Sequence, residues 1–396
     1  MPLGFYISVP FCKTKCTYCN FASDVFSHAV FDQYVARVGG EIEQAPRTAE
    51  QMGGEREREI DSIYFGGGTP TILEVTQLER IFVTISQNRA VKSGAEITVE
   101  CAPGTLTPSM LEAFVRLGVN RVSLGVQSFV EREAASVGRL HKRDIVLDDI
   151  ARLGAAGISN VNVDLIAGLP HQTRESWEQS LDDLIATGVP HASIYMLEVD
   201  DDSRLGRELI AGGQKYHAHF VPDDDLTAEF YEIACDRLKA AGIEQYEISN
   251  FAREGHESRH NLKYWTRQPY LGFGVDAHSM LRSAAGRGVV RFSNSDALEK
   301  YVTGSAQERT DVSPEAALQE AFFLGLRLNR GIDLAAIAKE FGPSLAGCYS
   351  EAMSELVEAG LIEREGDVIA LSARGRLLSN EVFERFISVN TVMQNA

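Results

Sequence analysis

The sequence lacks any apolar run long enough to cross a membrane. A membrane-spanning helix needs about 20 consecutive, predominantly apolar residues, and the 396 residues, of which 24% are charged, contain no such segment. Residues 1–10 also lack the basic start, apolar run and cleavage site that are typical of a secretory signal. These absences predict a cytoplasmic protein with no integral membrane segment.

Basic residues are few relative to acidic ones. The chain has 38 Lys and Arg against 56 Asp and Glu, which gives a formal net charge of -18. Phosphate binding needs clustered Lys and Arg, so the balance argues against nucleic acid as a partner. An anionic membrane surface would repel such a chain on average. The hydrophobic fraction of 44% is typical of a globular protein with a sizeable core.

Cysteine is scarce and unevenly distributed. Three of the six cysteines lie within residues 12–19, whereas Cys101, Cys235 and Cys348 are scattered. A disulfide framework would be unusual in a cytosolic chain of this size. We expect Cys235 and Cys348, which fall in helix-like runs, to be small core residues. The sequence also has no internal repeat and no low-complexity tract.

Short apolar runs typical of β-strands alternate with helix-like segments over the first half of the chain. The predicted strands are Phe5–Val9, Ile60–Phe65, Glu96–Cys101, Arg121–Gly125, Val161–Ile166 and Ala192–Leu197. This alternation predicts an α/β fold with a parallel sheet and right-handed connections. The sheet is either doubly wound or closed into a barrel-like (β/α) array. In both arrangements ligands bind at the carboxyl ends of the strands.

Three segments interrupt or follow this alternation. Residues Ala45–Glu59 are polar and highly charged, which predicts a surface insertion. Residues Asp200–Asp225 are also polar, and we expect them to cap one end of the barrel. The region Ile243–Ser293 is loop-rich and carries many Gly, His and aromatic residues, a composition that is unusual for a linker.

The character of the chain changes at about Ser313. Helical runs, a hairpin that turns at residues 365–367 and a last helix resemble a winged helix, a shape often used to bind DNA. Residues 312–396 hold 7 Lys and Arg against 12 Asp and Glu, a net charge of 7 − 12 = -5, which favours a packing or partner-docking module. The predicted elements are Pro314–Arg327, Leu334–Phe341, Leu345–Ala359, Leu361–Leu371 and Ala373–Phe386.

Three cysteines follow the first predicted strand directly, with the spacing Cys12-x3-Cys16-x2-Cys19. Three thiolates on one short loop can converge on a single metal centre. A [4Fe–4S] cluster needs four ligands, so three cysteines leave one iron with an open position. The alternatives are inert cysteines and a zinc site, but no fourth zinc ligand is evident. Lys13 and Lys15 add positive charge that favours the thiolate form.

The triplet, with an aromatic residue before its last cysteine, resembles the signature of the radical S-adenosylmethionine (SAM) superfamily. The resemblance implies a [4Fe–4S] cluster on Cys12, Cys16 and Cys19 and SAM on the unique iron. It implies that one electron cleaves SAM to methionine and a 5′-deoxyadenosyl radical. It also implies the superfamily's fold, a partial (β/α)6 TIM-like barrel.

A glycine-rich segment, Ile-Tyr-Phe-Gly-Gly-Gly-Thr-Pro-Thr, ends the second predicted strand at residues 63–71. Glycine lets backbone groups approach a ligand closely. By resemblance, Gly67, Gly68 and Thr69 belong to the motif that holds the methionine end of SAM. A tight strand-to-helix turn is the alternative interpretation.

Polar residues stand at or near the ends of later strands, where each would be costly to bury without a partner. The resemblance implies that Arg139 pairs with the carboxylate of SAM and that Gln127 and Asp164 bind its ribose. Glu100 matches a further acid that contacts SAM. A structural hydrogen bond is the alternative for each of them. The aromatic residues implied to contact SAM are Tyr6, Tyr18 and Phe21.

Within the superfamily these motifs resemble the group that contains oxygen-independent coproporphyrinogen III dehydrogenases and haem chaperones. Asn20 and Phe21 follow the triplet where the dehydrogenase has a fourth cysteine, and the triplet starts too early for the dehydrogenase's N-terminal arm. Residues 260–265, His-Asn-Leu-Lys-Tyr-Trp, match the HNxxYW motif implied to bind haem.

An imidazole such as His260 can ligate haem iron, and Tyr264 and Trp265 offer flat apolar surface to a macrocycle. A structural loop in which His260 is only hydrogen-bonded is the alternative. Weaker candidates for a haem ligand are His217, His219, His256 and His278.

These features predict a haem chaperone that binds a [4Fe–4S] cluster, SAM and haem and delivers haem to an apo-haemoprotein. An electron donor is a further expected partner, and a homodimer is one possible assembly. The expected domains are the barrel core (1–200), a capping segment that meets haem or substrate (201–311) and the C-terminal module (312–396). The alternatives are radical oxidative decarboxylation of coproporphyrinogen III and a radical SAM reaction on another substrate. SAM cleavage stays open.

Overall fold

The six predicted strands lie side by side in the computed structural model of the chain, which describes residues 1–286 and 288–387. They follow one another in sequence order and every neighbouring pair is parallel. A doubly wound sheet would reverse its strand order at a switch point. The array is therefore the barrel-like one. Its strands are β1 (Leu3–Val9), β2 (Glu59–Gly67), β3 (Ala90–Cys101), β4 (Arg121–Gln127), β5 (Asn160–Ala167) and β6 (His191–Met196).

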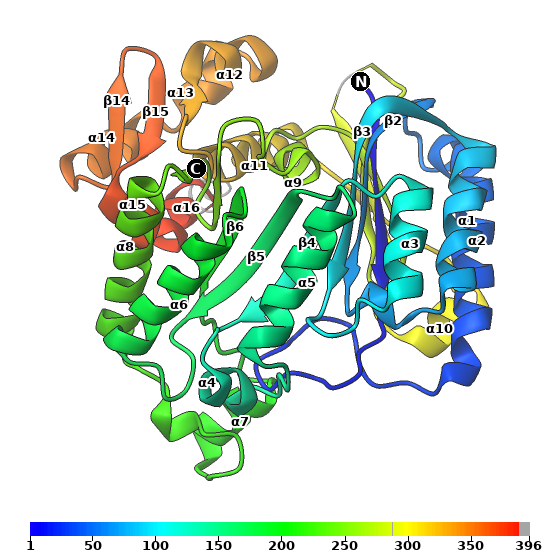
Figure 1. Cartoon of the computed structure of the whole chain (residues 1–396). Coiled ribbons are helices and arrows are strands. Elements are labelled where there is room, and N and C mark those ends of the chain that lie inside the picture. The colour runs from blue at the N-terminus through cyan, green and yellow to red at the C-terminus, as the bar shows by residue number, and fades with distance from the viewer. Residues whose placement is uncertain (287, 388–396) are drawn as a thin grey trace.

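Helices cover the outer face of this array (Figure 1). Thr107 and Thr173 cap the amino ends of two of them, and Gly118 and Gly188 end the same helices in left-handed conformation. No helix of the described residues is long and apolar enough to cross a membrane. The covering helices are α1 (Phe31–Gln51), α2 (Val75–Asn88), α3 (Pro108–Leu117), α5 (Arg143–Ala155), α6 (Arg174–Thr187) and α8 (Asp224–Ala240).

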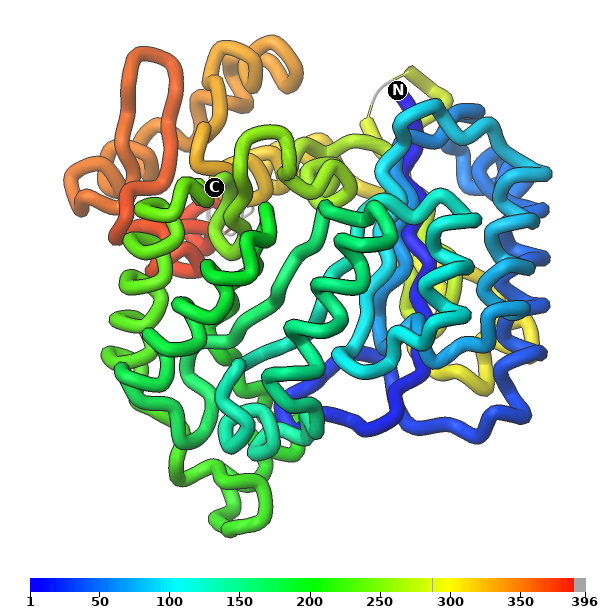
Figure 2. The backbone as a smooth tube through the Cα atoms, in the orientation of Figure 1, coloured from blue at the N-terminus to red at the C-terminus, as the bar shows by residue number. Residues whose placement is uncertain are grey.

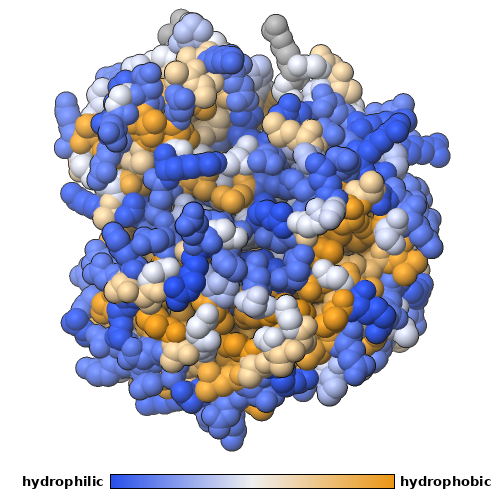
Figure 3. Space-filling model, turned by 45° about the horizontal axis from the view of Figure 1, so that its top comes forward, coloured by the Kyte–Doolittle hydropathy of each residue, from blue (hydrophilic) through white to orange (hydrophobic). Residues whose placement is uncertain are grey.

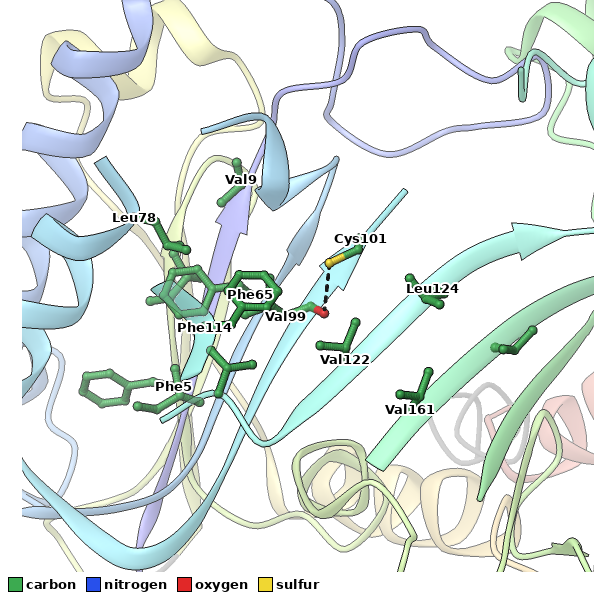
Figure 4. Packing of buried hydrophobic residues seen from close by; sticks show 14 of the residues in the cluster. Phe5, Val9, Phe65, Leu78, Val99, Cys101, Phe114, Val122, Leu124 and Val161 are labelled. Atoms are coloured by element: carbon green, nitrogen blue, oxygen red, sulfur yellow. Dashed lines mark hydrogen bonds between the residues drawn. The ribbon is translucent and has the colours of Figure 1, made fainter. Parts of the chain in front are cut away.

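The main hydrophobic core lies between the helices and the outer face of the sheet. Figure 4 shows Phe65 of β2 and Val99 of β3 near Leu78 of α2 and Phe114 of α3. The ring of Phe65 stacks on that of Phe82 with centroids 4.8 Å apart. Because side chains alternate across a strand, the same strands direct their other residues toward the barrel interior.

The predicted surface insertion at Ala45–Glu59 is wrong over its first half. Helix α1 continues to Gln51, and Ala45 and Ala49, four residues apart, are buried on the face toward the core. Small alanines supply these contacts, so the charged neighbours on the solvent face dominate the local composition.

Later segments extend the sheet on both sides. Strands β8 (Asn250–Ala252) and β7 (Glu244–Gln245) follow β6, while β9 (Tyr270–Gly274) pairs in parallel with β1. Residues 201–311 therefore supply strands to the sheet, and their capping role stays a prediction. The remaining elements here are α7 (Arg204–Ala211), α9 (Arg259–Trp265), α10 (Leu298–Thr303), β10 (His278–Arg282), β11 (Val289–Ser293) and β12 (Glu308–Asp311).

The C-terminal module has the predicted helices and hairpin around a core of its own. It lies with α9 at the end of the barrel where the chain begins, opposite residues 11–24 (Figures 1 and 2). The elements of the C-terminal module are α11 (Pro314–Leu326), β13 (Ile332–Asp333), α12 (Leu334–Phe341), α13 (Pro343–Gly347), α14 (Ser350–Glu358), β14 (Ile362–Glu365), β15 (Val368–Leu371), α15 (Ala373–Leu377) and α16 (Ser379–Ile387).

On the face of the molecule seen in Figure 3, hydrophilic side chains lie between several apolar areas.

The isolated cysteines differ in burial. Cys101 is buried at the end of β3, and Cys235 in α8 is half-buried against the main core. Cys348, predicted to be a core residue, is exposed instead. It follows the short helix α13, whose end turns its side chain away from the module's core.

Replacing Trp177 with Phe tests the packing of α6 on α8. The indole is fully buried and its Nε1–H donates to the carbonyl oxygen of Phe230 at 2.7 Å. The substitution removes the side-chain donor, leaving that carbonyl only its bond within α8, and opens a small void, so the free energy of unfolding should fall by about 2–4 kcal/mol.

The matched control is Trp265→Phe, because the buried Nε1 of Trp265 has no hydrogen-bond partner. Chemical denaturation followed by circular dichroism should show a loss of about 1 kcal/mol for this variant, from lost packing and cation–π contact. An equal loss in both variants would contradict the role assigned to the Trp177 hydrogen bond.

Candidate cofactor site at the carboxyl ends of the strands

The cysteine loop, residues 11–24, leaves β1 at its carboxyl end and is closed at its base. The N–H of Cys12 donates to the carbonyl of Asp24, and the N–H of Asp24 donates to the carbonyl of Pro10, both at 3.0 Å. These two bonds bring the ends of the loop together. The three cysteines are therefore presented on one closed turn of chain above the barrel.

The glycine-rich segment binds directly to the backbone of the cysteine loop. The N–H of Gly68 donates to the carbonyl of Val9 and that of Thr69 donates to the carbonyl of Phe11, each at 2.7 Å. A Cβ atom on residue 68 would stand 2.6 Å from the oxygen of Phe11 and 2.7 Å from that of Val9. Only glycine permits this approach, so residue 68 has a structural role in addition to the predicted SAM contact.

The three thiols of the loop are free cysteines, with Cys16 buried and Cys12 and Cys19 half-buried. Burial raises the pKa of both Cys12 and Cys16, and the guanidinium of Arg139 opposes this rise in the pKa of Cys16. From the sequence, Lys13 and Lys15 were predicted to favour the thiolate form. In the structure the charge that lowers the pKa of Cys16 comes from Arg139, and Lys15 lies 4.0 Å from Asp24.

Arg139 lies close to Cys16 and Tyr18, which are far from it in the sequence. Burial acts to lower the pKa of Arg139, but Cys16 and the phenol of Tyr18 raise this pKa overall. Its Nε is buried without a hydrogen-bond partner. Gln127, at a positive φ of 68°, stands beside it: a Cβ atom on Gly125 would lie 3.1 Å from Gln127 Nε2 and 3.4 Å from Arg139 Nη2.

Two acids line the barrel interior below the loop. Glu100 Oε1 accepts a hydrogen bond from Tyr64 at 2.8 Å, and burial, with Asp164 adding to it, raises the pKa of Glu100 to about 7. Asp164 accepts from Asn162 at 2.7 Å and from Ser123 at 3.1 Å, and burial raises its pKa as well. Both acids are thus held in place by neighbouring strands.

The three aromatic residues predicted to contact SAM lie in different parts of the structure. Tyr6 lies inside the barrel, with its ring centroid 6.1 Å from that of Tyr64. Tyr18 packs on a small buried cluster that includes Val137. Phe21 is 62% exposed at the outer edge of the cysteine loop. Of the three, Tyr18 and Phe21 belong to the cysteine loop, whereas Tyr6 lies deeper, with its ring centroid 6.3 Å from that of His260.

The residues present fit an iron–sulfur cluster better than a single metal ion. Within residues 1–286 and 288–387, no three His, Cys, Asp or Glu side chains are arranged to hold one ion. A four-iron cluster binds each thiolate at a different iron, so its ligands stand farther apart than those of tetrahedral zinc. Polar atoms of Thr17, Ser23 and Arg139 around the cysteine loop are buried without partners, as expected where a bound group completes the site.

His260 does not lie in this site. It belongs to α9, which covers the amino ends of β1 and β2 at the far end of the barrel (Figure 1). The imidazole is fully buried, with Nδ1 3.0 Å from Ser62 Oγ and Nε2 2.8 Å from the hydroxyl of Tyr264. Burial, with smaller effects of Lys263 and Arg121, lowers the pKa of His260 to about 3.

Both ring nitrogens of His260 are therefore engaged in hydrogen bonds, and its ligation of haem iron stays a prediction. The structural alternative fits: the backbone N–H of His260 donates to Glu96 at 3.0 Å, and Trp265 stacks 4.4 Å from Arg327 of the C-terminal module. Of the weaker candidates, His278 is exposed near Asp276 at 3.8 Å. His256 and His217 are half-buried, and His219 is exposed.

The sequence analysis missed the polar network inside the barrel. Asn162, His191 and Tyr246 form a hydrogen-bonded chain, with His191 Nδ1 2.6 Å from Asn162 Oδ1 and Nε2 3.0 Å from the hydroxyl of Tyr246. The signal was present as polar residues two apart in otherwise apolar strands, such as Ser62 and Tyr64.

Glu100→Gln tests the buried acid through the pH dependence of stability. The pKa of Glu100 is raised to about 7 from 4.5, so its contribution is complete below pH 4.5 and is lost as the pH rises through 7. The amide does not titrate. The stability of wild type relative to the variant should fall by about 3 kcal/mol between pH 4.5 and pH 8 in cluster-free protein.

The control is Glu59→Gln, an exposed acid on β2. Urea denaturation at several pH values should give a difference from wild type that changes little over this range. A pH-independent difference for Glu100→Gln would show that Glu100 titrates as an ordinary surface acid.

Comparisons with known proteins agree with this geometry. Residues 6–184 match the radical SAM superfamily and residues 312–378 match the HemN C-terminal domain. The chain is 33% identical to the heme chaperone HemW of Bacillus subtilis, over 96% of this chain and 98% of that protein. It is 30% identical to HemW of Escherichia coli, over 98% of each.

The fold has a close counterpart among solved structures. Coproporphyrinogen III oxidase (HemN) from Escherichia coli superposes with a TM-score of 0.82 at 24% identity, over 97% of this chain and 90% of that chain. The likeness confirms the predicted radical SAM barrel with its C-terminal module. The sequence relationship extends over nearly the whole chain, and the chain therefore belongs to the HemW family of the radical SAM superfamily.

Proposed function

We propose that this protein is a haem chaperone that binds a [4Fe–4S] cluster, SAM and haem and delivers haem to apo-haemoproteins. The observation that carries the proposal is the full-length similarity to heme chaperones, including 33% identity over 96% of this chain. The closed cysteine loop at the strand ends supports the cofactor part. The relatives are named heme chaperones, which supports haem as the molecule that is delivered.

In this proposal Cys12, Cys16 and Cys19 hold the cluster. The cluster, when bound, supplies the electron and the open iron site that radical SAM chemistry needs. Arg139, whose side chain lies beside Cys16, would pair with a carboxylate next to the open iron. Gly67, Gly68 and Thr69 would face the same group from the neighbouring strand end, because their segment is bonded to the cysteine loop.

The barrel residues would orient the remainder of SAM. Gln127 and Asp164 would bind ribose hydroxyls, and Glu100 would bind a further polar group of SAM. Tyr6 and Tyr18, with Phe21 at the rim, would pack against its apolar surfaces. The chain's own contribution is thus to hold SAM in one orientation above a polar, partly enclosed interior.

Each of the three domains predicted from the sequence would have a separate role. Residues 1–200 would hold the cofactors, residues 201–311 would meet haem, and residues 312–396 would dock partners. The separate core of the C-terminal module and the match at residues 312–378 support a boundary near 312. An electron donor and an apo-haemoprotein are the expected partners, and two copies of the chain could assemble as a homodimer.

The alternative, oxygen-independent dehydrogenation of coproporphyrinogen III, is not favoured. Asn20 and Phe21 occupy the positions where the dehydrogenase has a further cysteine. The likeness to HemN is one of fold at 24% identity, whereas the chaperones are more similar in sequence.

Replacing the loop cysteines tests the cluster. Cys12→Ser, Cys16→Ser and Cys19→Ser should each lose most of the iron, sulfide and visible absorption of anaerobically reconstituted protein, because each removes one of three protein ligands. The control Cys348→Ser removes an exposed thiol far from the loop and should keep about four irons per chain. If the protein with all three cysteines replaced by serine still bound its full complement of iron and sulfide, the proposal would be wrong.

Haem transfer separates the chaperone from the enzyme. Reconstituted protein loaded with haem should restore the Soret band of an apo-cytochrome supplied in trans. The same protein, given coproporphyrinogen III, SAM and a reductant without oxygen, should produce no protoporphyrinogen. Formation of protoporphyrinogen, or failure of the wild type to bind any haem, would overturn the chaperone assignment.

A further inference from the structure

A cavity of about 580 Å³ lies at the amino end of the barrel, opposite the cysteine loop. Its lining includes the first residue of β1, residues 55–58 before β2 and residues 86–90 at the end of α2 and the start of β3. Ligand-binding pockets typically enclose about 300–1,000 Å³. The cavity is therefore large enough for a small organic molecule, and none of the residues assigned above to the cluster or to SAM lines it.

The floor of the cavity is apolar. Leu3 of β1, Leu271 of β9 and Leu281 of β10 line it, and Pro46 and Ala49 of α1 also belong to the lining. The three leucines, here called the leucine floor, are part of the main hydrophobic core and are held in place by it. A ligand gains free energy on this floor only by covering it with apolar surface.

Charged side chains make up much of the remaining lining. Three arginines and two glutamates give it a net charge of 3 − 2 = +1, whereas the whole chain carries -18. Glu57 pairs with the amino group of Met1 at 2.6 Å, and Arg56 pairs with Glu50, which lies outside the lining. The lining charges that have no ion pair among the described residues are Arg58, Arg89 and Glu55.

The guanidinium of Arg89 is half-buried and has donors to spare. Burial lowers the pKa of Arg89, and no acid opposes that shift. Of its five N–H donors, one reaches the carbonyl of Asn88 at 3.4 Å, and the buried Nε has no partner. Arg89 is not needed to cap the preceding carbonyls of α2, because those of Val83 and Thr84 accept from the side chains of Ser86 and Asn88. The donors of Arg89 can therefore bind an oxyanion.

Arg58 adds a second guanidinium to the same cavity. Its side chain is exposed and forms no hydrogen bond or ion pair within the part of the chain that the structure describes. A guanidinium binds a carboxylate through two parallel N–H···O bonds. The unpaired Glu55 would repel a doubly charged head more than a singly charged one. The lining therefore favours a carboxylate over a phosphate.

We propose that this cavity binds a small organic carboxylate with an aliphatic body, held at its head by Arg58 and Arg89 and along its body by the leucine floor. The cavity and the cysteine loop lie at opposite ends of the barrel, so the carboxylate and SAM can be bound at the same time. The inference does not depend on the proposed function, since neither haem nor SAM takes part in this site.

Isothermal titration calorimetry of the full-length, cluster-reconstituted protein tests the class of ligand, with octanoate as the probe. Wild type should bind octanoate at a single saturable site. Acetate lacks the apolar body and octylammonium reverses the charge of the head, so each should bind about tenfold more weakly or worse. Equal binding of octylammonium and octanoate, or no saturable binding of octanoate, would overturn the inference and leave the proposed function untouched.

The double variant Arg58→Gln/Arg89→Gln tests the head of the site. It removes both guanidiniums and keeps the leucine floor, so octanoate should bind about tenfold more weakly or worse. The control, Arg47→Gln/Arg330→Gln, makes the same change in net charge at two exposed arginines outside the lining and should bind octanoate as wild type does. Unchanged binding in the first double variant, or an equal loss in both, would contradict the site.

Ser86→Trp tests the cavity without altering a charge. Ser86 is exposed in the lining, and its hydroxyl bonds only to the carbonyl of Val83 in its own helix, so an indole can occupy the cavity while α2 stays folded. Octanoate binding should fall about tenfold. The control is Ser354→Trp, an exposed serine in α14 whose hydroxyl bonds to the carbonyl of Ser350, and it should keep wild-type binding. Undiminished affinity in Ser86→Trp would place octanoate outside the cavity and overturn the inference.

Discussion

The close approach of Gly68 to the backbone of Val9 and Phe11 is the contact on which the cofactor site depends. It joins two loops that leave neighbouring parallel strands, and it does so through main-chain bonds of 2.7 Å. A side chain at residue 68 would collide with both acceptor oxygens. Because the bonds fix Thr69 against the cysteine loop, the three thiols and the glycine-rich segment form one rigid rim.

The barrel beneath this rim has a polar interior with two distinct ends. At the carboxyl end, Glu100 and Arg139 are held near the cysteines, and burial raises the pKa of Glu100 to about 7. At the amino end, His260 and Lys263 of α9 are buried, with Lys263 Nζ 2.7 Å from Asp61. These paired groups stabilise the amino end. At the carboxyl end, polar atoms of Thr17, Ser23 and Arg139 around the cysteine loop have no partner and can receive a ligand.

The sequence predicted what depends on local pattern and missed what depends on distant partners. Strand runs and the cysteine spacing placed the barrel and its cofactor end, because β-periodicity and loop position are local properties. The motif at residues 260–265 looked like a ligand site in isolation. Its environment comes from Ser62, 198 residues away, which no local pattern reveals. In the same way, buried Ala45 and Ala49 were hidden among the charged residues of α1.

Residues 204–220 are attached directly to the cysteine loop. The N–H of Leu205 donates to the carbonyl of Thr17 at 2.9 Å, and the side chain of Arg204 donates to the carbonyl of Lys15 at 3.4 Å. Thr17 lies next to Cys16, so binding of a cluster at Cys16 constrains the carbonyl to which Leu205 is bonded. A ligand can shift an equilibrium only by its differential affinity for two states. The position of residues 204–220 will therefore depend on the cluster to the extent that these bonds form only in the loaded loop.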